Sequence, residues 1–357
     1  MDVEKIVLDY INSKSEMPNQ SKNEQLNYDY LSSGSIDSMQ MVEMIEFLES
    51  KFKMRFNSED FQLNKFRLVG GLIEIIKKHL SQDKNWKEKC YKMSNSDYSK
   101  SDLVKALKKI GLKEGNLVFI HSSMFHLGRL ENGNSSENIS RIVFDSFFEV
   151  LGSTGTLLVP TYTYSFCKGE SFDVKNTPSS IGAFTEFFRN QNGAIRSADP
   201  IFSVSGIGPK SKIILSNLPK SCFGEDSVYD RITKLNGKLC LIGLGLSGAT
   251  YRHYVDQKMN IPARFSKYFS GKILEDGNER TETWEYFVRY LSENCYPDPE
   301  VMEKNLKKAN ANNVWKKEKV GRGEILSINC IDFLKLMERE LKKDPWFSVR
   351  GPPINTE

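Results

Sequence analysis

The spacing of apolar residues changes near residue 100, and this change divides the chain into two parts. Before residue 81, apolar positions recur every three or four residues, as they do along one face of an amphipathic helix. This period predicts helices over residues 2–13, 38–52 and 71–80. Residues 81–100 are polar and lack such a period, which is typical of a linker.

Beyond residue 100, short apolar runs alternate with helical stretches. A first helix begins at Ser101-Asp102, which would cap it, and ends at Gly111. Strands are predicted at NLVFIHSS, GTLLVPTY and GKLCLIGLG, which cover residues 116–123, 155–162 and 237–245, with helices over 139–151 and 181–190. Strands that alternate with helices favour a layered α/β domain.

Together these patterns predict a two-domain protein of mixed α/β class. The predicted parts are a small all-α bundle over residues 1–82, a linker over 83–100, and a layered α/β domain over 101–357.

The composition is that of a globular protein, because 39% of the 357 residues are hydrophobic and 27% are charged. No run approaches the roughly 18–20 apolar residues of a membrane span. The N-terminus also lacks the apolar core of a signal peptide. The six cysteines are scattered without a CxxC pair, which favours reduced thiols over a disulfide or zinc framework. We expect a cytoplasmic protein.

The charge is unevenly distributed between the two parts. Residues 1–80 hold ten basic and thirteen acidic residues, so their net charge is −3. Because the net charge of the whole chain is +4, the remaining residues carry a net charge of +7. The lysines at 304–319 are interleaved with Glu318 and asparagines and lack an aromatic stacking pattern, which favours a solvated surface over nucleic-acid binding. The basic excess suits anionic ligands such as coenzyme A or a nucleotide-sugar.

The segment GSIDSM (residues 34–39) precedes an acidic amphipathic helix. It resembles the Asp-Ser-Leu motif of the acyl carrier protein family, with Met39 in place of the leucine. The resemblance covers about residues 1–82. It implies a four-helix bundle, a 4′-phosphopantetheine arm on Ser38, and modification by a phosphopantetheinyl transferase. A serine at a helix N-terminus also welcomes a phosphodiester. The alternative is that Asp37 or Ser38 only caps the helix.

Residues 101 to about 345 resemble the aminoglycoside 3-N-acetyltransferase family. The matching stretches lie at 106–124, 155–166, 172–189, 196–208, 223–245 and 249–257. The resemblance implies acyl transfer from a coenzyme A thioester to an amine. Asp199 stands where these enzymes commonly carry histidine, and Tyr254 and Asp256 depart from the usual His-x-Ala-Glu. With GRGEIL (321–326), these departures resemble relatives among surface-polysaccharide genes, which implies a nucleotide-linked amino-sugar as the acceptor.

Amide formation from a thioester requires a base for the amine proton and donors for the oxyanion, but no metal. His253 is the candidate base, because in a helix over 249–259 it is adjacent to both Thr250 and Asp256. Asp256 is expected to orient the imidazole and raise its basicity. The alternative is a core histidine. Asp199 is either a second carboxylate or the cap of a turn before Pro200.

Other candidates are expected to bind the donor and the acceptor. His121, Ser122 and Ser123 end a strand, where ligand sites of α/β proteins lie, and this loop can offer backbone donors to pantetheine. Thr177, Ser179 and Ser180 open the helix over 181–190, a plausible phosphate site or plain capping. Tyr162 and Tyr164 are the candidate acceptor-binding side chains.

Three further features are weighed and set aside. GLGLSG (243–248) spells GxGxxG, but the following IPARFSKYFSG is basic, contains proline and is not expected to be a strand ending in an acid. Its glycines are expected to let the backbone approach another ligand. Cys167 lacks an adjacent base for a nucleophile, and His79 is expected on the surface.

The leading hypothesis is an amino-sugar N-acyltransferase supplied by acyl-CoA or by its own carrier. Supply by the carrier would involve a separate acyl-loading enzyme. The alternatives are aminoglycoside 3-N-acetylation from acetyl-CoA and a non-catalytic carrier or docking module.

Overall fold

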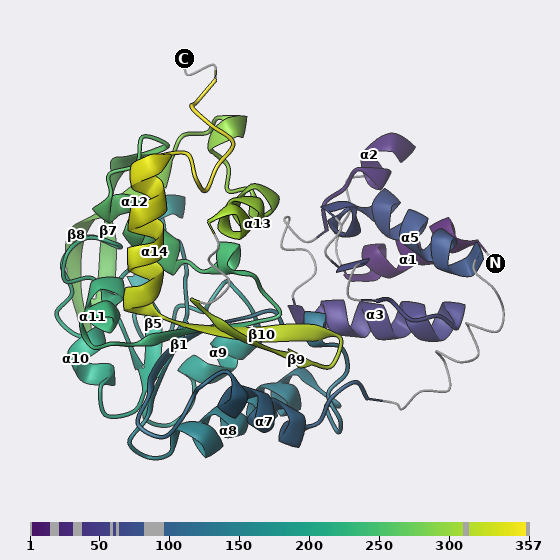
Figure 1. Ribbon diagram of the computed structural model, residues 1–357, viewed down its shortest axis with the longest axis horizontal. Helices are drawn as coiled ribbons and strands as arrows, with labels where there is room; N and C mark the ends of the chain where they lie inside the picture. Colours follow the sequence, from purple (N-terminus) through teal and green to yellow (C-terminus); the bar gives the residue numbers. More distant parts are fainter. Residues whose placement is uncertain are drawn as a thin grey trace.

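The computed structural model describes residues 2–14, 21–30, 38–57, 60–61, 64–81, 96–309 and 314–354. Its first part, here called the N-terminal unit (residues 2–81), is helical and lies to one side of the molecule (Figure 1). Its helices are α1 (Val3–Lys14), α2 (Lys22–Leu26), α3 (Ser38–Phe52) and α5 (Val69–Ser81), with a 3-10 turn η1 (Asn64–Arg67). All three helices predicted here are confirmed, and α3 has the predicted bounds.

Apolar faces of these helices close a core of their own. Met41, Met44 and Leu48 of α3 pack with Leu72 and Ile76 of α5. Residues 31–37, and with them most of the GSIDSM segment, lie outside the described residues, as does the side chain of Ser38.

His79, expected on the surface, is instead buried in the N-terminal unit. Its side chain is 2% exposed, and its Nε2 lies 2.7 Å from Oδ2 of the equally buried Asp60. The carboxylate allows a polar ring at this core position because it satisfies one of the ring nitrogens.

The larger domain (residues 96–354) is built on a seven-stranded sheet in the order β4-β5-β2-β1-β6-β10-β9. The strands are β1 (Leu117–Ser122), β2 (Thr156–Pro160), β4 (Ile195–Arg196), β5 (Val204–Ile207), β6 (Lys238–Ile242), β9 (Lys316–Val320) and β10 (Gly323–Asn329). Within the described strands of this sheet, β2, β1 and β6 pair in parallel, and the strands that flank them pair antiparallel. The three predicted strands are these central three.

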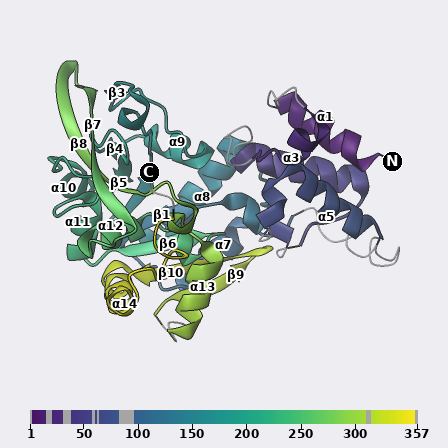
Figure 2. The same cartoon turned by 90° about the horizontal axis from the view of Figure 1, so that it is seen from above.

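Helices cover both faces of this sheet (Figures 1 and 2). Val118 and Ile120 of β1 face the core formed with α7 (Lys100–Lys109), α8 (Ser136–Leu151) and α9 (Ala183–Arg189). The alternate residues Leu117 and Phe119 face the core formed with α11 (Val228–Lys234), α12 (Tyr251–Lys258) and α14 (Cys330–Lys343), as strand alternation requires. The remaining helices are α10 (Ser211–Leu215) and α13 (Pro299–Lys308).

A second sheet follows α12, in the order β3-β7-β8. Its strands are β3 (Phe172–Asp173), β7 (Arg264–Glu275) and β8 (Asn278–Arg289). The prediction that IPARFSKYFSG is not a strand is therefore wrong. The stretch begins a twelve-residue hairpin strand whose positions are mostly exposed on both faces, so no apolar alternation marks it in the sequence.

The end of the predicted linker belongs to the larger domain. Tyr98 is buried and forms a bridge with Leu130, and the backbone N–H of Asp97 donates to the carbonyl of Arg129 at 2.7 Å. The cap of α7 is Ser99 with Asp102 in a capping box, two residues before the predicted Ser101. Residues 83–95 lie outside the described residues.

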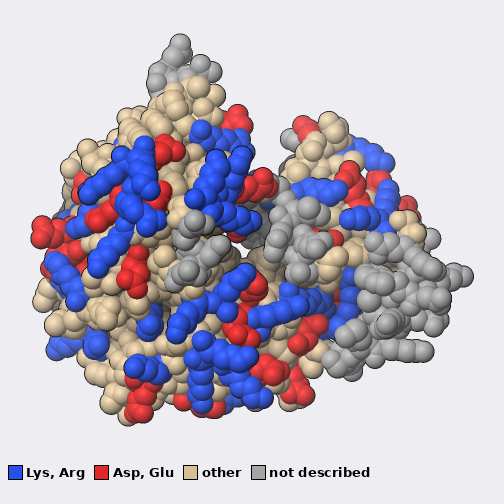
Figure 3. All heavy atoms as spheres, in the orientation of Figure 1, with Lys and Arg blue, Asp and Glu red and all other residues tan. Residues whose placement is uncertain are grey.

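Basic side chains gather over α13 and the β9–β10 hairpin on the face shown in Figure 3, with acidic ones interspersed. Several of these form exposed ion pairs, such as Lys317 with Glu324 and Lys109 with Glu318. None of the helices in the described part of the chain combines the length and apolar character that crossing a bilayer requires.

Candidate functional site

The start of α12 brings together the histidine and carboxylate predicted from the sequence. His253 Nδ1 lies 3.7 Å from Asp256 Oδ2, as their spacing on one helix requires. The His253 side chain keeps 17% of its surface exposed, whereas Asp256 keeps 2%. The pair therefore has a buried carboxylate beneath a ring that solvent still reaches.

Arg264, at the start of β7, lies between these two groups and was not predicted. Its Nη2 donates to His253 Nδ1 at 2.6 Å, and its Nε forms an ion pair with Asp256 Oδ2 at 3.0 Å. Arg252 Nε stands 4.0 Å from the same carboxylate oxygen. Asp256 Oδ1 is buried and has no hydrogen-bond partner among the described residues. One acceptor of the carboxylate thus stays free inside the site.

This arrangement lowers the basicity of His253 instead of raising it. Burial and the positive charges of Arg264 and Arg252 outweigh Asp256 and lower the pKa of His253 to about 3. Burial alone would raise the pKa of Asp256, but the neighbouring His253 and the two arginines bring it below its usual range. The expectation of a more basic imidazole is therefore wrong for the arrangement with Arg264 inserted.

Thr250 and His121 complete this end of α12. The backbone N–H of Thr250 donates to His121 Nε2 at 3.4 Å, and burial lowers the pKa of His121 to about 4. Because Nε2 accepts, Nδ1 carries the hydrogen, and it is buried without a partner among the described residues. Tyr162 joins the group, since its hydroxyl interacts with Thr250 and lies 2.8 Å from that of Tyr229.

Asp199 caps a turn, the simpler of the two roles considered for it. Its Oδ1 accepts the backbone N–H groups of Ile201 and Phe202, each at 2.8 Å, and lies 3.6 Å from Cys222 Sγ. Burial raises the pKa of Asp199 to about 6. Phe202, whose backbone it holds, places its ring 6.4 Å from the ring of His253. Asp199 thus holds the backbone that carries a ring near His253.

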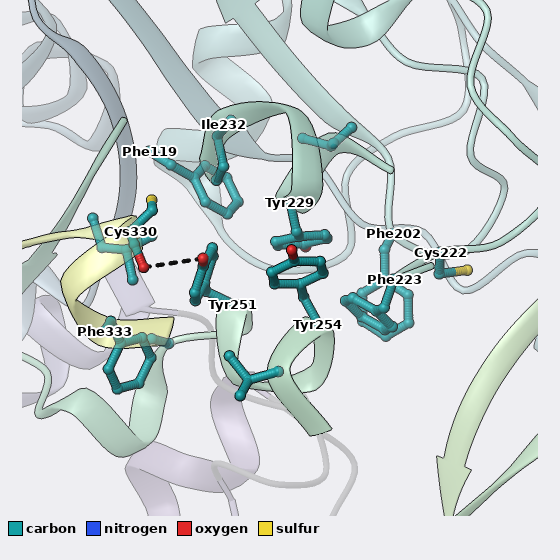
Figure 4. Close-up of a cluster of buried hydrophobic side chains, with 14 of the residues drawn as sticks. Phe119, Phe202, Cys222, Phe223, Tyr229, Ile232, Tyr251, Tyr254, Cys330 and Phe333 are labelled. Atoms are coloured by element: carbon teal, nitrogen blue, oxygen red, sulfur yellow. Dashed lines mark hydrogen bonds between the residues drawn. The ribbon is translucent and has the colours of Figure 1, made fainter. Parts of the chain in front are cut away.

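An aromatic wall forms the apolar side of the site. Figure 4 shows Phe202 and Phe223 close together beside Cys222, with Tyr229 and Tyr254 next to them. The Phe223 ring lies 5.3 Å from that of His253 and 4.7 Å from that of Phe202. Tyr164, with the left-handed φ of 56°, sets its ring 5.3 Å from Phe202. Such a backbone conformation in a bulky residue is costly and is found at binding sites.

The Ser122–Ser123 loop offers less than predicted. The backbone N–H of Ser123 donates to the carbonyl of Ile242, so it is not free for a ligand. Ser123 Oγ lies 3.0 Å from His126 Nδ1. Ser122 remains half-buried and borders a small pocket lined mainly by apolar side chains, among them Met124, Val143, Ile181 and Phe184.

The hydroxyls expected to form a phosphate site are engaged locally. Thr177 Oγ1 accepts from the backbone of Asp173, and Ser179 Oγ pairs with Thr185 Oγ1 at 2.8 Å. The backbone N–H of Ser179 donates to Glu186 Oε2 at 2.8 Å. Helix α9 begins only at Ala183, and Ser180 donates to the carbonyl of Tyr162. A carboxylate already occupies the N–H that a phosphate would use.

The structure gives no support to a ligand site at the glycines of residues 243–248 or to Cys167 as a nucleophile. Gly243 has a φ of 64°, and a Cβ there would lie 2.4 Å from the carbonyl oxygen of Ser123, so this glycine accommodates the chain's own loop, not a ligand. The antiparallel hairpin that follows α12 also departs from a dinucleotide-binding unit. Partial burial, with Asp199 nearby, raises the pKa of Cys167 to about 11, which leaves it a thiol and a poor nucleophile.

The chain is similar to known proteins over this domain. Residues 119–342 match the family model described as aminoglycoside 3-N-acetyltransferase. Aminoglycoside N(3)-acetyltransferase IV of a Salmonella species is 27% identical over 184 residues, which are 51% of this chain and 66% of that protein. The matches to the first curated relatives thus span just under two thirds of those proteins' length.

Solved structures share the fold. AAC-VIa bound to sisomicin has a TM-score of 0.60 and 25% identity, covering 69% of this chain and 98% of that one. A binary complex of AAC-IIIb with CoASH has a TM-score of 0.58 and 18% identity, covering 69% and 96%.

Proposed function

Because this chain belongs to the aminoglycoside 3-N-acetyltransferase family, we propose that it is an N-acyltransferase that acetylates an aminoglycoside-type amino-sugar from acetyl-CoA. The observation that carries the proposal is the group of His253, Arg264 and Asp256 beside an aromatic wall. The group lies next to His121, at the carboxyl end of the parallel strand β1, where ligands of α/β proteins bind. The scattered cysteines favour a reducing, cytoplasmic location.

The reaction forms one bond and breaks one. The amine nitrogen attacks the thioester carbonyl, the C–N bond forms, and the C–S bond breaks. The amine proton passes to a base, and the departing thiolate takes a proton to leave as the free thiol of coenzyme A. No oxidant, reductant or metal enters the balance.

The contact with Arg264 decides whether His253 can act as a hydrogen-bond donor or as a base in this reaction. With Nδ1 accepting from Arg264, the neutral ring carries its hydrogen on Nε2, which then donates and can stabilise the oxyanion or protonate the thiolate. To act as a base, Nε2 must be free of hydrogen, so Nδ1 must donate to Asp256 instead. The 3.7 Å separation and the unpartnered Asp256 Oδ1 leave room for that exchange once Arg264 swings aside.

A second candidate function concerns the donor. The N-terminal unit packs beside the Ser122–Ser123 loop, and its α3 begins at Ser38. The free N–H groups of a helix start suit a phosphodiester, so Ser38 fits the attachment of 4′-phosphopantetheine, which when bound supplies a thioester-bearing thiol. In this version a phosphopantetheinyl transferase attaches the arm, and an acyl-loading enzyme attaches the acyl group to its thiol. The acceptor is a nucleotide-linked amino-sugar of surface polysaccharide.

Steady-state kinetics distinguish the two versions. Acetyl-CoA with sisomicin as acceptor should give the higher kcat/KM if the first version holds, and a nucleotide-linked amino-sugar should give it if the second holds. Turnover of neither acceptor would contradict both. Intact mass after co-expression with a phosphopantetheinyl transferase, compared with that of Ser38→Ala, tests the arm independently of any acceptor.

A further inference from the structure

Phe125 marks the surface where the N-terminal unit meets the larger domain. It lies in η2 (Met124–Leu127), the 3-10 turn directly after the Ser122–Ser123 loop, yet it is buried in the core of the N-terminal unit. Its ring meets that of Phe61 edge to face, with centroids 6.1 Å apart. The larger domain therefore inserts an aromatic side chain into the core of the N-terminal unit. The two units thus share part of one apolar core and do not only touch at their surfaces.

A buried carboxylate of α3 secures the same contact. Glu49, 2% exposed, accepts from Arg322 Nη1 and Nη2 at 2.5 and 3.1 Å and from Arg129 Nη2 at 3.0 Å. Arg322 lies in the turn between β9 and β10 and is itself only 9% exposed. A buried charge that loses its partner is strongly destabilising, so these groups need each other.

Next to Glu49, a second ion pair joins the units with the charges reversed, so that the N-terminal unit supplies the arginine and the larger domain the carboxylate. Asp97 of the larger domain accepts from Arg55 of the N-terminal unit at 3.2 Å and from Arg322 Nε at 3.0 Å. Each unit thus presents both an arginine and a carboxylate to the other. A shifted register would leave at least one of them buried and unpaired, which selects a single docked arrangement.

The larger domain also holds η2 rigidly. A Cβ on Gly321 would lie 2.1 Å from the carbonyl oxygen of Leu127, and one on Gly323 would lie 2.6 Å from that of His126. The β9–β10 turn therefore packs directly against the backbone of η2, and Arg322 donates its backbone N–H to Leu127 at 3.0 Å. Phe125 is presented from a fixed support.

We propose that η2 and the β9–β10 turn form a dedicated docking surface for the chain's own N-terminal unit, which holds this unit in one orientation beside the Ser122–Ser123 loop. The unit is then a fixed part of the enzyme and not a body moving freely on a tether. If Ser38 carries the acyl arm, the arm begins about 17 Å along α3 from Glu49 and always belongs to the same larger domain. Delivery within one chain rests on the proposed carrier function, whereas docking does not.

The docking is tested with the full chain carrying a protease site within residues 82–95. After cleavage, the two halves of the unmodified protein should remain together at micromolar concentration on size exclusion. Phe125→Ala and Arg322→Met should raise the Kd of the halves by about 100-fold or more. Lys317→Met, on the same hairpin but 57% exposed, and Glu43→Gln, 60% exposed, should change it by less than about threefold.

Separation of the unmodified halves at this concentration would overturn the docking, as would an unchanged Kd for Arg322→Met. Should either large substitution prevent folding, Glu49→Gln provides the measurement, because it keeps the shape of the side chain and removes its charge. An increase of at least about tenfold in Kd is expected for it, and an unchanged Kd would again contradict the proposal.

Delivery within one chain is tested by mixing full-length Ser38→Ala with full-length His253→Ala. With the acyl group loaded on Ser38, the mixture should transfer at no more than about a tenth of the unmodified rate at equal concentration. A mixture as fast as the unmodified protein would overturn delivery in cis and leave the docking intact. Transfer by Ser38→Ala from free acyl-CoA reports separately on the proposed acyltransferase function.

Discussion

At the scale of single residues, an arginine of the candidate site lies between a histidine and a carboxylate. His253 and Asp256 were predicted as neighbours because a helix brings residues three apart onto one face. Arg264 was not predicted, since it follows Asp256 by eight positions and reaches it only because the chain reverses after α12. Helical spacing cannot predict such a reversal of the chain. The sequence therefore predicted that His253 and Asp256 are neighbours, but not that Arg264 contacts both.

Replacing Arg264 by methionine should raise the pKa of His253. The substitution removes a positive charge 2.6 Å from Nδ1 and lets Asp256 accept from the ring directly. The imidazole titration is measured by NMR through the His253 ring signals, with Lys258→Met on the same helix as the control. A His253 pKa that stays near 3 or falls would show that Arg264 does not determine the protonation of the ring.

Stability should fall as the pH drops below about 6.5. Burial lowers the pKa of His121 and His126 to about 4 and that of His253 to about 3. Between these values and pH 6.5, the histidines are therefore protonated in the unfolded chain but neutral in the folded chain. Asp199 offsets one of them, because its raised pKa lets the folded chain take up a proton below about pH 6. Each uncompensated histidine contributes at most about 1.4 kcal/mol per pH unit.

Urea unfolding at pH 7.5, 6.0 and 5.0 measures this dependence. The stabilisation is complete above the unfolded pKa of 6.5 and is lost progressively below it, so the midpoint should decrease at each step. A midpoint that rises from pH 7.5 to 5.0 would mean that these histidines become charged inside the folded protein.

At the scale of elements, prediction succeeded where burial was complete and failed where it was not. The strands β1, β2 and β6 are apolar runs because both of their faces are covered by helices. Most positions of the hairpin strand β7 are exposed, and its sequence therefore carries no apolar alternation. Thr177 and Ser179 were expected to open the helix over 181–190, but α9 begins only at Ala183. The partners of Ser179, Thr185 and Glu186, were not predicted, because they depend on how the chain folds back onto this loop.

The support of η2 by the β9–β10 turn can be tested with one glycine. Gly321→Ala introduces a Cβ 2.1 Å from the carbonyl of Leu127 at a φ of 57°. Gly277→Ala is the matched control, because its φ of 79° is equally left-handed and nothing lies within 4 Å. The control should cost about 1 kcal/mol of unfolding free energy, and Gly321→Ala about 1–3 kcal/mol more.

Thermal or urea unfolding of the two variants supplies the comparison. Equal losses for both would indicate that η2 yields to the added methyl group, and so that it is no rigid support for Phe125.

At the scale of the whole molecule, the account joins a family domain to a second, helical unit. The family match begins at Phe119, so the N-terminal unit lies outside it. The acidic character of that unit and the basic character of the larger domain were visible in the sequence. The ion pairs of the interface were not visible, because they join residues as far apart as Glu49 and Arg322.

The central claim is that the cluster at the start of α12 catalyses acyl transfer from a thioester to an amine. It is tested most directly by the release of coenzyme A thiol from acetyl-CoA in the presence of sisomicin or a nucleotide-linked amino-sugar, with the amide product followed by mass. His253→Ala should lower kcat/KM by about 10²–10⁴ with an unchanged unfolding midpoint, whereas Cys167→Ser should stay within about threefold of the unmodified rate. Thiol release that does not depend on the amine, or that His253→Ala retains in full, would contradict the account.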